Sequence, residues 1–204
     1  MQSRALVVSA LLFLPGTLLG QDVAPPPPSD SSAFHPGQWA VQFGGGLNLV
    51  SLGALKFTSP RRAWLLDVGV SAVIVNGKVT DTFGGGTTDA NDHFTGLNVR
   101  VGRRFYGGGR GKITPFHSLA LEGGYQNREF EQATGRLASS QWYGGLYWEV
   151  GAAYRIAPAL SVGGTASISG GYLNRKQEDP TLVFKGHGFY FDGVQVQLVV
   201  GIYF

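Results

Sequence analysis

The clearest evidence for the fold of this chain is the stretch WYGGLYWEVGAAYRI, residues 142–156. Apolar side chains occupy every second position within it: Trp142, Leu146, Trp148, Val150, Ala152, Tyr154 and Ile156. Polar Glu149 and Arg155 fall between them, so the period is two and not the period of about 3.6 that a helix would show. A tilted strand crosses a bilayer in about 9 to 11 residues, so this run is typical of a transmembrane β-barrel.

The same alternation recurs throughout residues 38–204. Apolar residues alternate with polar or small ones in segments 39–47, 51–58, 64–74, 93–106, 119–125, 160–172 and 194–204. Clusters of Gly, Pro, Asn and Asp separate these segments. Together with the first run they make about eight strands, which is a common size for small barrels. The fold class that we predict is all-β, a roughly eight-stranded antiparallel transmembrane up-and-down β-barrel.

The connections between the segments alternate between short and long. The short ones are residues 59–62, residues 107–112 and the bend at Pro158, and the long ones are Thr80–Asp92, Ala133–Gln141 and Glu178–Gly188. Outer-membrane barrels have short turns at their periplasmic end and longer loops outside the cell. We therefore predict that the three long segments are extracellular loops.

Residues 1–20 have the anatomy of a secretory signal peptide. Arg4 supplies an early positive charge, residues 5–14 form an apolar stretch too short to span a membrane as a helix, and Pro15 follows. We predict cleavage after residue 20. Residues 21–37 then form a Pro- and Ser-rich periplasmic linker, whose composition favours an extended backbone without a core of its own.

The composition argues against several classes of protein. The chain has 16 Lys and Arg against 13 Asp and Glu, and the bases are scattered, which is not the signature of a nucleic-acid-binding protein. There is no cysteine, so the chain can form no disulfide and offers no lipoprotein cysteine at the predicted cleavage site. Glycine is abundant, at 32 residues, but lacks the collagen period, and the aromatic content of 12% argues against disorder.

The C-terminal stretch VQVQLVVGIYF, residues 194–204, ends on an aromatic residue. With the signal peptide, the alternating strands and the alternating connections, it resembles the small outer-membrane barrels of the OmpA/OmpX-like superfamily, which carry an outer membrane protein beta-barrel domain. The resemblance implies a location in the cell outer membrane, among its lipids. It also implies recognition by the barrel assembly machinery through Phe204, with Ile202 and Val200 at alternate positions before it. The family often has Tyr where Ile202 stands. We expect a monomer.

Other patterns that suggest chemistry are incomplete. The stretch YGGGRGKIT, residues 106–114, has Tyr106 where a phosphate-binding loop needs its first Gly and Ile113 where it needs Ser or Thr, so we predict a turn. The four histidines have no second ligand at metal-binding spacing. His117 and Ser118 are neighbours in a strand and point to opposite faces. We therefore assign no catalytic, cofactor-binding or metal-binding residue.

Six charged residues lie on the polar faces of the predicted strands: Asp67, Arg100, Arg104, Glu122, Glu149 and Arg155. Three acids and three bases inside a narrow barrel can neutralise one another across the lumen. We predict that they form a polar network in the lumen, with Glu122 and Glu149 close to Arg100. The interior of an eight-stranded barrel is just wide enough for side chains to fill it, which favours a structural plug over a gated ion passage.

These observations favour a structural or surface-interaction scaffold, whose extracellular loops contact a partner and which has neither enzymatic activity nor a cofactor. Two alternatives stay open. A narrow porin-like channel would need an open lumen. A lipid A-modifying or phospholipid-modifying enzyme would need a serine, a histidine and an acidic residue that converge at the outer leaflet.

Overall fold

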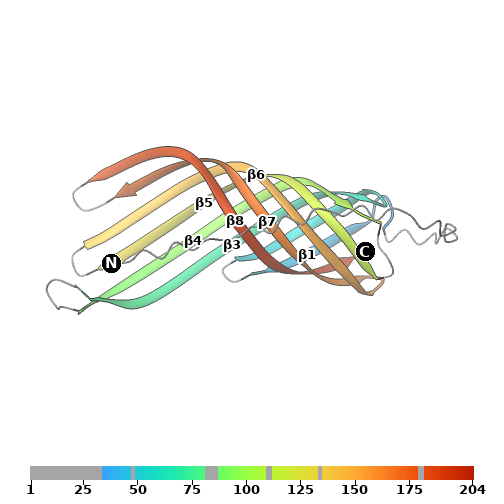
Figure 1. Ribbon diagram of the computed structural model, residues 1–204, viewed down its shortest axis with the longest axis horizontal. Coiled ribbons are helices and arrows are strands. Elements are labelled where there is room, and N and C mark those ends of the chain that lie inside the picture. The colour runs from blue at the N-terminus through green and yellow to red at the C-terminus, as the bar shows by residue number, and fades with distance from the viewer. Residues whose placement is uncertain (1–33, 47–48, 81–86, 109–111, 133–134, 179–181) are drawn as a thin grey trace, which may run out of the picture. The chain divides into compact units, whose positions relative to one another are not determined.

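The alternating side chains form eight strands that close into one barrel (Figure 1). The computed structural model describes residues 34–46, 49–80, 87–108, 112–132, 135–178 and 182–204. The strands are β1 (Trp39–Gly45), β2 (Leu49–Ser59), β3 (Arg62–Thr80), β4 (Thr87–Tyr106), β5 (Ile113–Gln132), β6 (Gly135–Ala157), β7 (Leu160–Glu178) and β8 (Val183–Tyr203). Each strand pairs antiparallel with the next, so the predicted fold class is confirmed. No helix among these residues is long and apolar enough to span a membrane.

The last strand closes the barrel against the first. β8 pairs with β1 from Ala40 opposite Tyr203 to Gly45 opposite Leu198. Beyond this ladder, the backbone N–H of Trp39 donates to the carbonyl of Phe204 and the N–H of Phe204 donates to the carbonyl of Trp39, both at 3.0 Å. Closure satisfies backbone groups that would otherwise be unpaired in hydrocarbon, at a cost of several kcal/mol each.

Deleting Phe204 is expected to reduce assembly in cells more than it reduces the stability of the finished barrel. The Phe204 ring is 70% exposed, so its loss removes little packing, and the strand it terminates stays paired from Tyr203 onward. We expect refolding into detergent micelles to stay largely intact, while the inserted fraction in cells falls. Outer-membrane fractionation of the truncated protein measures this, and accumulation at wild-type levels would contradict it.

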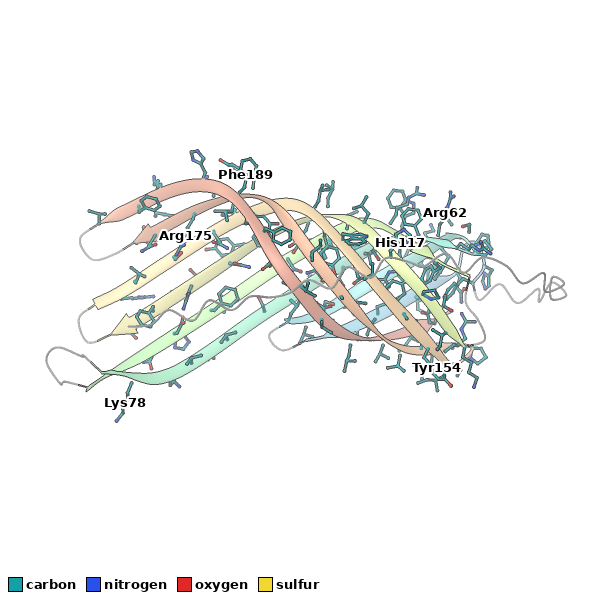
Figure 2. All side chains as sticks on the ribbon, in the orientation of Figure 1. Arg62, Lys78, His117, Tyr154, Arg175 and Phe189 are labelled. Atoms are coloured by element: carbon teal, nitrogen blue, oxygen red, sulfur yellow. The ribbon has the colours of Figure 1, made fainter. Side chains whose placement is uncertain are left out.

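The outer surface of the barrel is apolar between two aromatic belts. On the outward faces, large apolar side chains are exposed, among them Leu66, Val68, Leu121, Leu146, Val196 and Leu198. One belt contains Trp39, Trp64 and Tyr154, near the end of the barrel with the short turns. The other contains Tyr125, Trp142, Tyr172 and Phe189, and Phe189 and Tyr154 mark the two levels (Figure 2). This is the outer surface of a transmembrane barrel.

One aromatic residue near the short-turn end of its strand faces the lumen and not the lipid. Phe57 is 1% exposed and faces the lumen. It pairs with Ala63 in the ladder of β2 and β3, and it has the same parity as Ser51 and Leu55, both of which are buried. The register therefore turns this ring inward.

Six strands continue far beyond the second aromatic belt, which corrects the prediction of three long loops. β3 to β8 have 19 to 23 residues each, whereas β1 and β2 have 7 and 11. Most of the segments Thr80–Asp92, Ala133–Gln141 and Glu178–Gly188 belong to strands. We call the six projecting strand ends the extension, and the end of the barrel that carries it the extended end.

The extension was not recognised in the sequence because apolar and polar side chains are mixed on both of its faces. A half-buried strand is recognised by an apolar face, but the hydrogen bonds between backbones need none. Ion pairs join adjacent strands instead: Arg128 donates to Asp92 through Nε at 2.9 Å and Nη2 at 2.5 Å, and Arg136 donates to Glu129 at 2.6 Å. The hydrogen bonds from Arg128 lower the pKa of Asp92 from its ordinary value, so this pair stays charged at neutral pH.

A β-bulge in β8 hides part of its pattern. Ser167 pairs with Gln195, but Ser169 pairs with Asp192, so β8 has one more residue than β7 between these positions. On one side of the bulge the odd-numbered residues of β8, such as Phe189, face outward. On the other side the even-numbered residues, such as Val194, face outward. The alternation of apolar and polar residues shifts by one position at the bulge. Residues 183–191 were therefore not recognised as part of the last strand.

The extended end is expected to face the exterior of the cell. Limited proteolysis of intact cells with trypsin tests this orientation, because Arg128, Arg136, Lys176 and Lys185 lie in the extension. Fragments ending at these residues are the expected result. Cleavage confined to the turn at residues 59–62 would show that the barrel has the opposite orientation.

Candidate functional site

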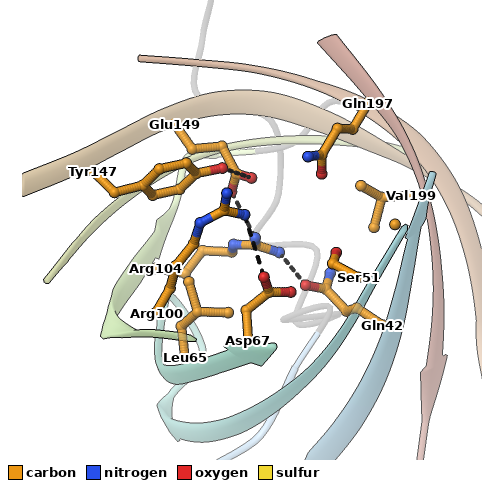
Figure 3. Close-up of a pocket in the computed structure, with 11 residues that line it drawn as sticks. Gln42, Ser51, Leu65, Asp67, Arg100, Arg104, Tyr147, Glu149, Gln197 and Val199 are labelled. Atoms are coloured by element: carbon orange, nitrogen blue, oxygen red, sulfur yellow. Dashed lines mark hydrogen bonds and ion pairs between the residues drawn. The ribbon is translucent and has the colours of Figure 1, made fainter. Parts of the chain in front are cut away.

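The lumen of the barrel is filled by two layers of inward side chains. Adjacent residues of a strand point to opposite faces, so each strand contributes every second residue to the lumen. The layer at the short-turn end is aromatic, with Phe34, Phe57, Tyr106, Phe116 and Tyr203. The layer above it, toward the extended end, is polar and contains five of the six charged residues singled out in the sequence. Figure 3 draws four of them: Asp67, Arg100, Arg104 and Glu149.

Arg104 of β4 donates three hydrogen bonds within the polar layer. Its Nε donates to Ser118 Oγ at 2.8 Å, its Nη1 to Gln42 Oε1 at 2.7 Å, and its Nη2 to Glu149 Oε1 at 2.6 Å. Glu149 also accepts from Ser118 at 2.9 Å and from Tyr147 at 3.1 Å. All five side chains are buried, so strands β1, β4, β5 and β6 are tied together inside the lumen.

Arg100, which lies on the same strand nearer the extended end, forms a second ion-pair group. Its Nη1 lies 3.3 Å from Asp67 Oδ1, and its Nη2 lies 3.6 Å from Glu122 Oε1. Its guanidinium carbon lies 4.2 Å from the centre of the Tyr147 ring, within cation–π range. Tyr147 therefore contacts both groups, since its hydroxyl donates to Glu149.

The structure places the six predicted network residues in three settings. Arg100 does meet Glu122, as expected, but the ion-pair partner of Glu149 is Arg104 and not Arg100. The prediction assumed that residues at similar distances from the strand ends lie at the same height in the lumen. Because neighbouring strands are staggered around the barrel, such residues can lie at different heights. Arg155 lies in the aromatic layer, with its guanidinium carbon 4.9 Å from the centre of the Phe34 ring.

Several members of the polar layer were missed in the sequence because they are uncharged. Gln42, Ser51, Ser118 and Gln197 are all less than 9% exposed and face inward. Each of them lies an even number of positions from an inward-facing charged or small residue of its own strand, so it points to the same side. A search of the inward positions for every polar side chain, and not for charges alone, would have found them.

A small space remains within the polar layer. The space left among Gln42, Asp67, Arg100, Arg104, Glu149 and their neighbours is about 20 Å³, room for roughly one water molecule. Widening this space would separate the side chains around Arg104 from their partners, and a separated buried charge is strongly destabilising.

The aromatic layer is completed by a residue that precedes the first strand. Phe34 is 2% exposed and stacks on Phe57 at 4.3 Å between ring centres, with Tyr106 at 4.6 Å. A turn at Pro36 and Gly37 reverses the chain between Phe34 and β1, and Gly37 has a φ of +87°, which favours glycine. Phe34 falls within the predicted linker, so this one residue of the segment packs inside the barrel, whereas residues 35–37 are exposed.

The geometry around Ser118 offers no nucleophile that a histidine could activate. Ser118 is fully buried and bonds to Arg104 and Glu149, whereas His117 faces outward and stacks on Phe105 at 5.1 Å. Among the residues that the structure describes, no three His, Cys, Asp or Glu side chains are grouped so that they could hold a metal ion.

The architecture resembles solved outer-membrane proteins. No family model and no curated protein matches the chain. The crystal structure of the outer membrane protein OprG from Pseudomonas aeruginosa matches with a TM-score of 0.53 and 12% identity, over 85% of this chain and 98% of that one. A major outer membrane protein from Thermus thermophilus matches with a TM-score of 0.51 and 15% identity, over 82% of this chain and 98% of that one.

This chain is an outer-membrane β-barrel protein. Its fold is that of the small eight-stranded barrels, and its apolar surface between two aromatic belts has the form that an outer membrane requires. Identities of this size show the fold alone, so the role of this barrel must come from its own residues.

Proposed function

We propose that this outer-membrane barrel is a non-conducting scaffold that presents the extension to partners outside the cell. The observation that supports the proposal is the packing of two layers of side chains in the lumen. The polar layer leaves about 20 Å³ of space, and the aromatic layer beneath it packs Phe34 against Phe57, Tyr106 and Tyr203. A side-chain-filled lumen is what a barrel of this size permits.

The extension is suited to contact with another molecule. It continues six strands beyond the aromatic belt, held by exposed ion pairs such as Arg128 with Asp92. Its outward and inward faces both carry polar side chains, and a rigid sheet holds them in fixed positions. We propose that specificity lies in these strand ends and in the connections between them.

Planar-bilayer recording tests the closed lumen. The full mature protein, reconstituted and checked for folding by heat-modified gel mobility, is expected to give no single-channel conductance. The conductance of an Arg104→Ala variant is compared with that of the wild-type protein, because the variant lacks the side chain that joins Gln42, Ser118 and Glu149. Discrete conductance steps in the wild-type protein would favour the narrow porin-like channel instead.

We further propose that the barrel has no catalytic activity on lipid A or phospholipids. The proposal is supported by the burial of Ser118 and by the outward direction of His117, which lie on opposite faces of β5. An acylation and deacylation assay in outer-membrane lipid vesicles is expected to show no turnover. Turnover that is lost in a Ser118→Ala variant would overturn this assignment.

A further inference from the structure

The outward face of β5, β6 and β7 is hollowed just above the second aromatic belt. The groove has a volume of about 500 Å³, within the range of about 300–1,000 Å³ typical of ligand sites. Its floor is made of small residues of β6, Ala138 and Ser140, and its walls are longer side chains of β5 and β7. Tyr125, which packs on Trp142 at 4.6 Å, forms its lower rim.

The charged side chains of the groove are balanced in sign. Arg136 pairs with Glu129 at 2.6 Å, and Lys176 pairs with Glu178. Two acids and two bases give the groove no net attraction for an anion, but they supply many hydrogen-bond donors and acceptors, to which Ser140 adds a hydroxyl. An aromatic rim beside such a set suits a polyhydroxylated, uncharged ligand, whose C–H faces pack on rings while its hydroxyl groups bond to the walls.

A shallow depression continues from this groove into the lipid-facing surface. Directly below the pair of Tyr125 and Trp142, Gly123 of β5 pairs with Gly144 of β6, and both face outward. A Cβ atom added at either glycine would meet nothing closer than a backbone oxygen at 3.7 Å, so the space above them is open. Val99 and Tyr172 pair with these glycines from either side and border the depression.

We propose that this groove and depression together bind one glycolipid of the leaflet at the extended end. The sugar head group lies in the groove between β5 and β7, and an acyl chain lies over Gly123 and Gly144. The aromatic pair of Tyr125 and Trp142 sits at the boundary between the two parts, where such rings are favoured. A ligand that is apolar below this level and polar above it is a membrane lipid, and the balanced charges select a sugar head group over an anionic one.

Native mass spectrometry of the full mature protein, released from nanodiscs, tests the proposal. The nanodiscs contain phosphatidylcholine with a minor fraction of diglycosyl diacylglycerol, and parallel preparations replace the glycolipid with phosphatidylglycerol or phosphatidylethanolamine. We expect the wild-type protein to retain one glycolipid well above its share of the bilayer. Equal retention of all lipids, or preferential retention of either phospholipid, would overturn the proposal.

Two variants locate the site, and each has a matched control. Ala138→Trp fills the floor of the groove and Gly144→Leu fills the depression, so both are expected to abolish the preference. Ala72→Trp is an exposed substitution on β3, and Gly164→Leu is an outward one on β7 where the nearest atom also lies at 3.7 Å. Both controls are expected to keep the preference, with folding checked by heat-modified gel mobility. Equal losses in variants and controls would contradict the assigned site.

The outcome is independent of the closed lumen. The groove faces away from the lumen, so a conducting barrel could still bind the lipid, and a non-conducting one could fail to bind it. Conductance and lipid retention therefore test the two proposals separately.

Discussion

Replacing Glu149 with alanine is expected to lower the free energy of unfolding by about 3–5 kcal/mol, as for other broken buried ion pairs. The change leaves Arg104, whose side chain is 3% exposed, without its counter-charge. It also removes the acceptor of the Ser118 and Tyr147 hydroxyls. Three buried polar groups then lose a partner at once, and each unsatisfied group adds to the cost.

Urea titration of tryptophan fluorescence in detergent micelles measures this effect. Val150→Ala is the matched control, because Val150 is the next residue of β6 but faces lipid, so its truncation is expected to cost less. Glu149→Gln, which keeps the shape but not the charge, is expected to fall between wild type and alanine. Equal midpoints for wild type and Glu149→Ala would show that the polar layer contributes nothing to stability.

Truncating Phe34 is the second change with a large expected effect. A buried Phe→Ala substitution costs about 3–5 kcal/mol, because it leaves a cavity that the surroundings fill only in part. Phe34 packs against Phe57, Tyr106 and Tyr203, and it lies under the guanidinium of Arg155, so its loss opens the aromatic layer from the short-turn end.

The same urea titration and a temperature series of gel mobility measure the loss in Phe34→Ala. Phe204→Ala is the control at the same end of the barrel, because its ring is 70% exposed and its truncation is expected to cost far less. Phe34→Leu, which refills most of the space, is expected to recover much of the stability. A Phe34→Ala protein as stable as wild type would show that this residue does not complete the barrel.

The sequence alone was sufficient for the fold, the approximate number of strands and the location. Alternation with period two in the run from Trp142 to Ile156 identifies a strand with one lipid-facing side, and membrane burial makes that alternation strict. Outside the membrane, outward side chains need not be apolar, so the alternation is no longer required. Parts of the extension, including residues 183–188 at the start of β8, were therefore predicted as loops, because backbone ladders and ion pairs stabilise them without requiring a strict apolar alternation.

In the polar layer, too, the sequence predicts one part of the arrangement and the tertiary structure determines the other. Parity along each strand predicted which charged residues face inward, and Arg100, Arg104, Glu122 and Glu149 do. Which acid meets which base depends on register and stagger around the closed barrel. A shift of one residue in one ladder would turn a whole strand's side chains to the other face. The pairing of Glu149 with Arg104, and the burial of Phe34 from outside the strands, were therefore decided by the tertiary structure, which brings residues together that no local pattern connects.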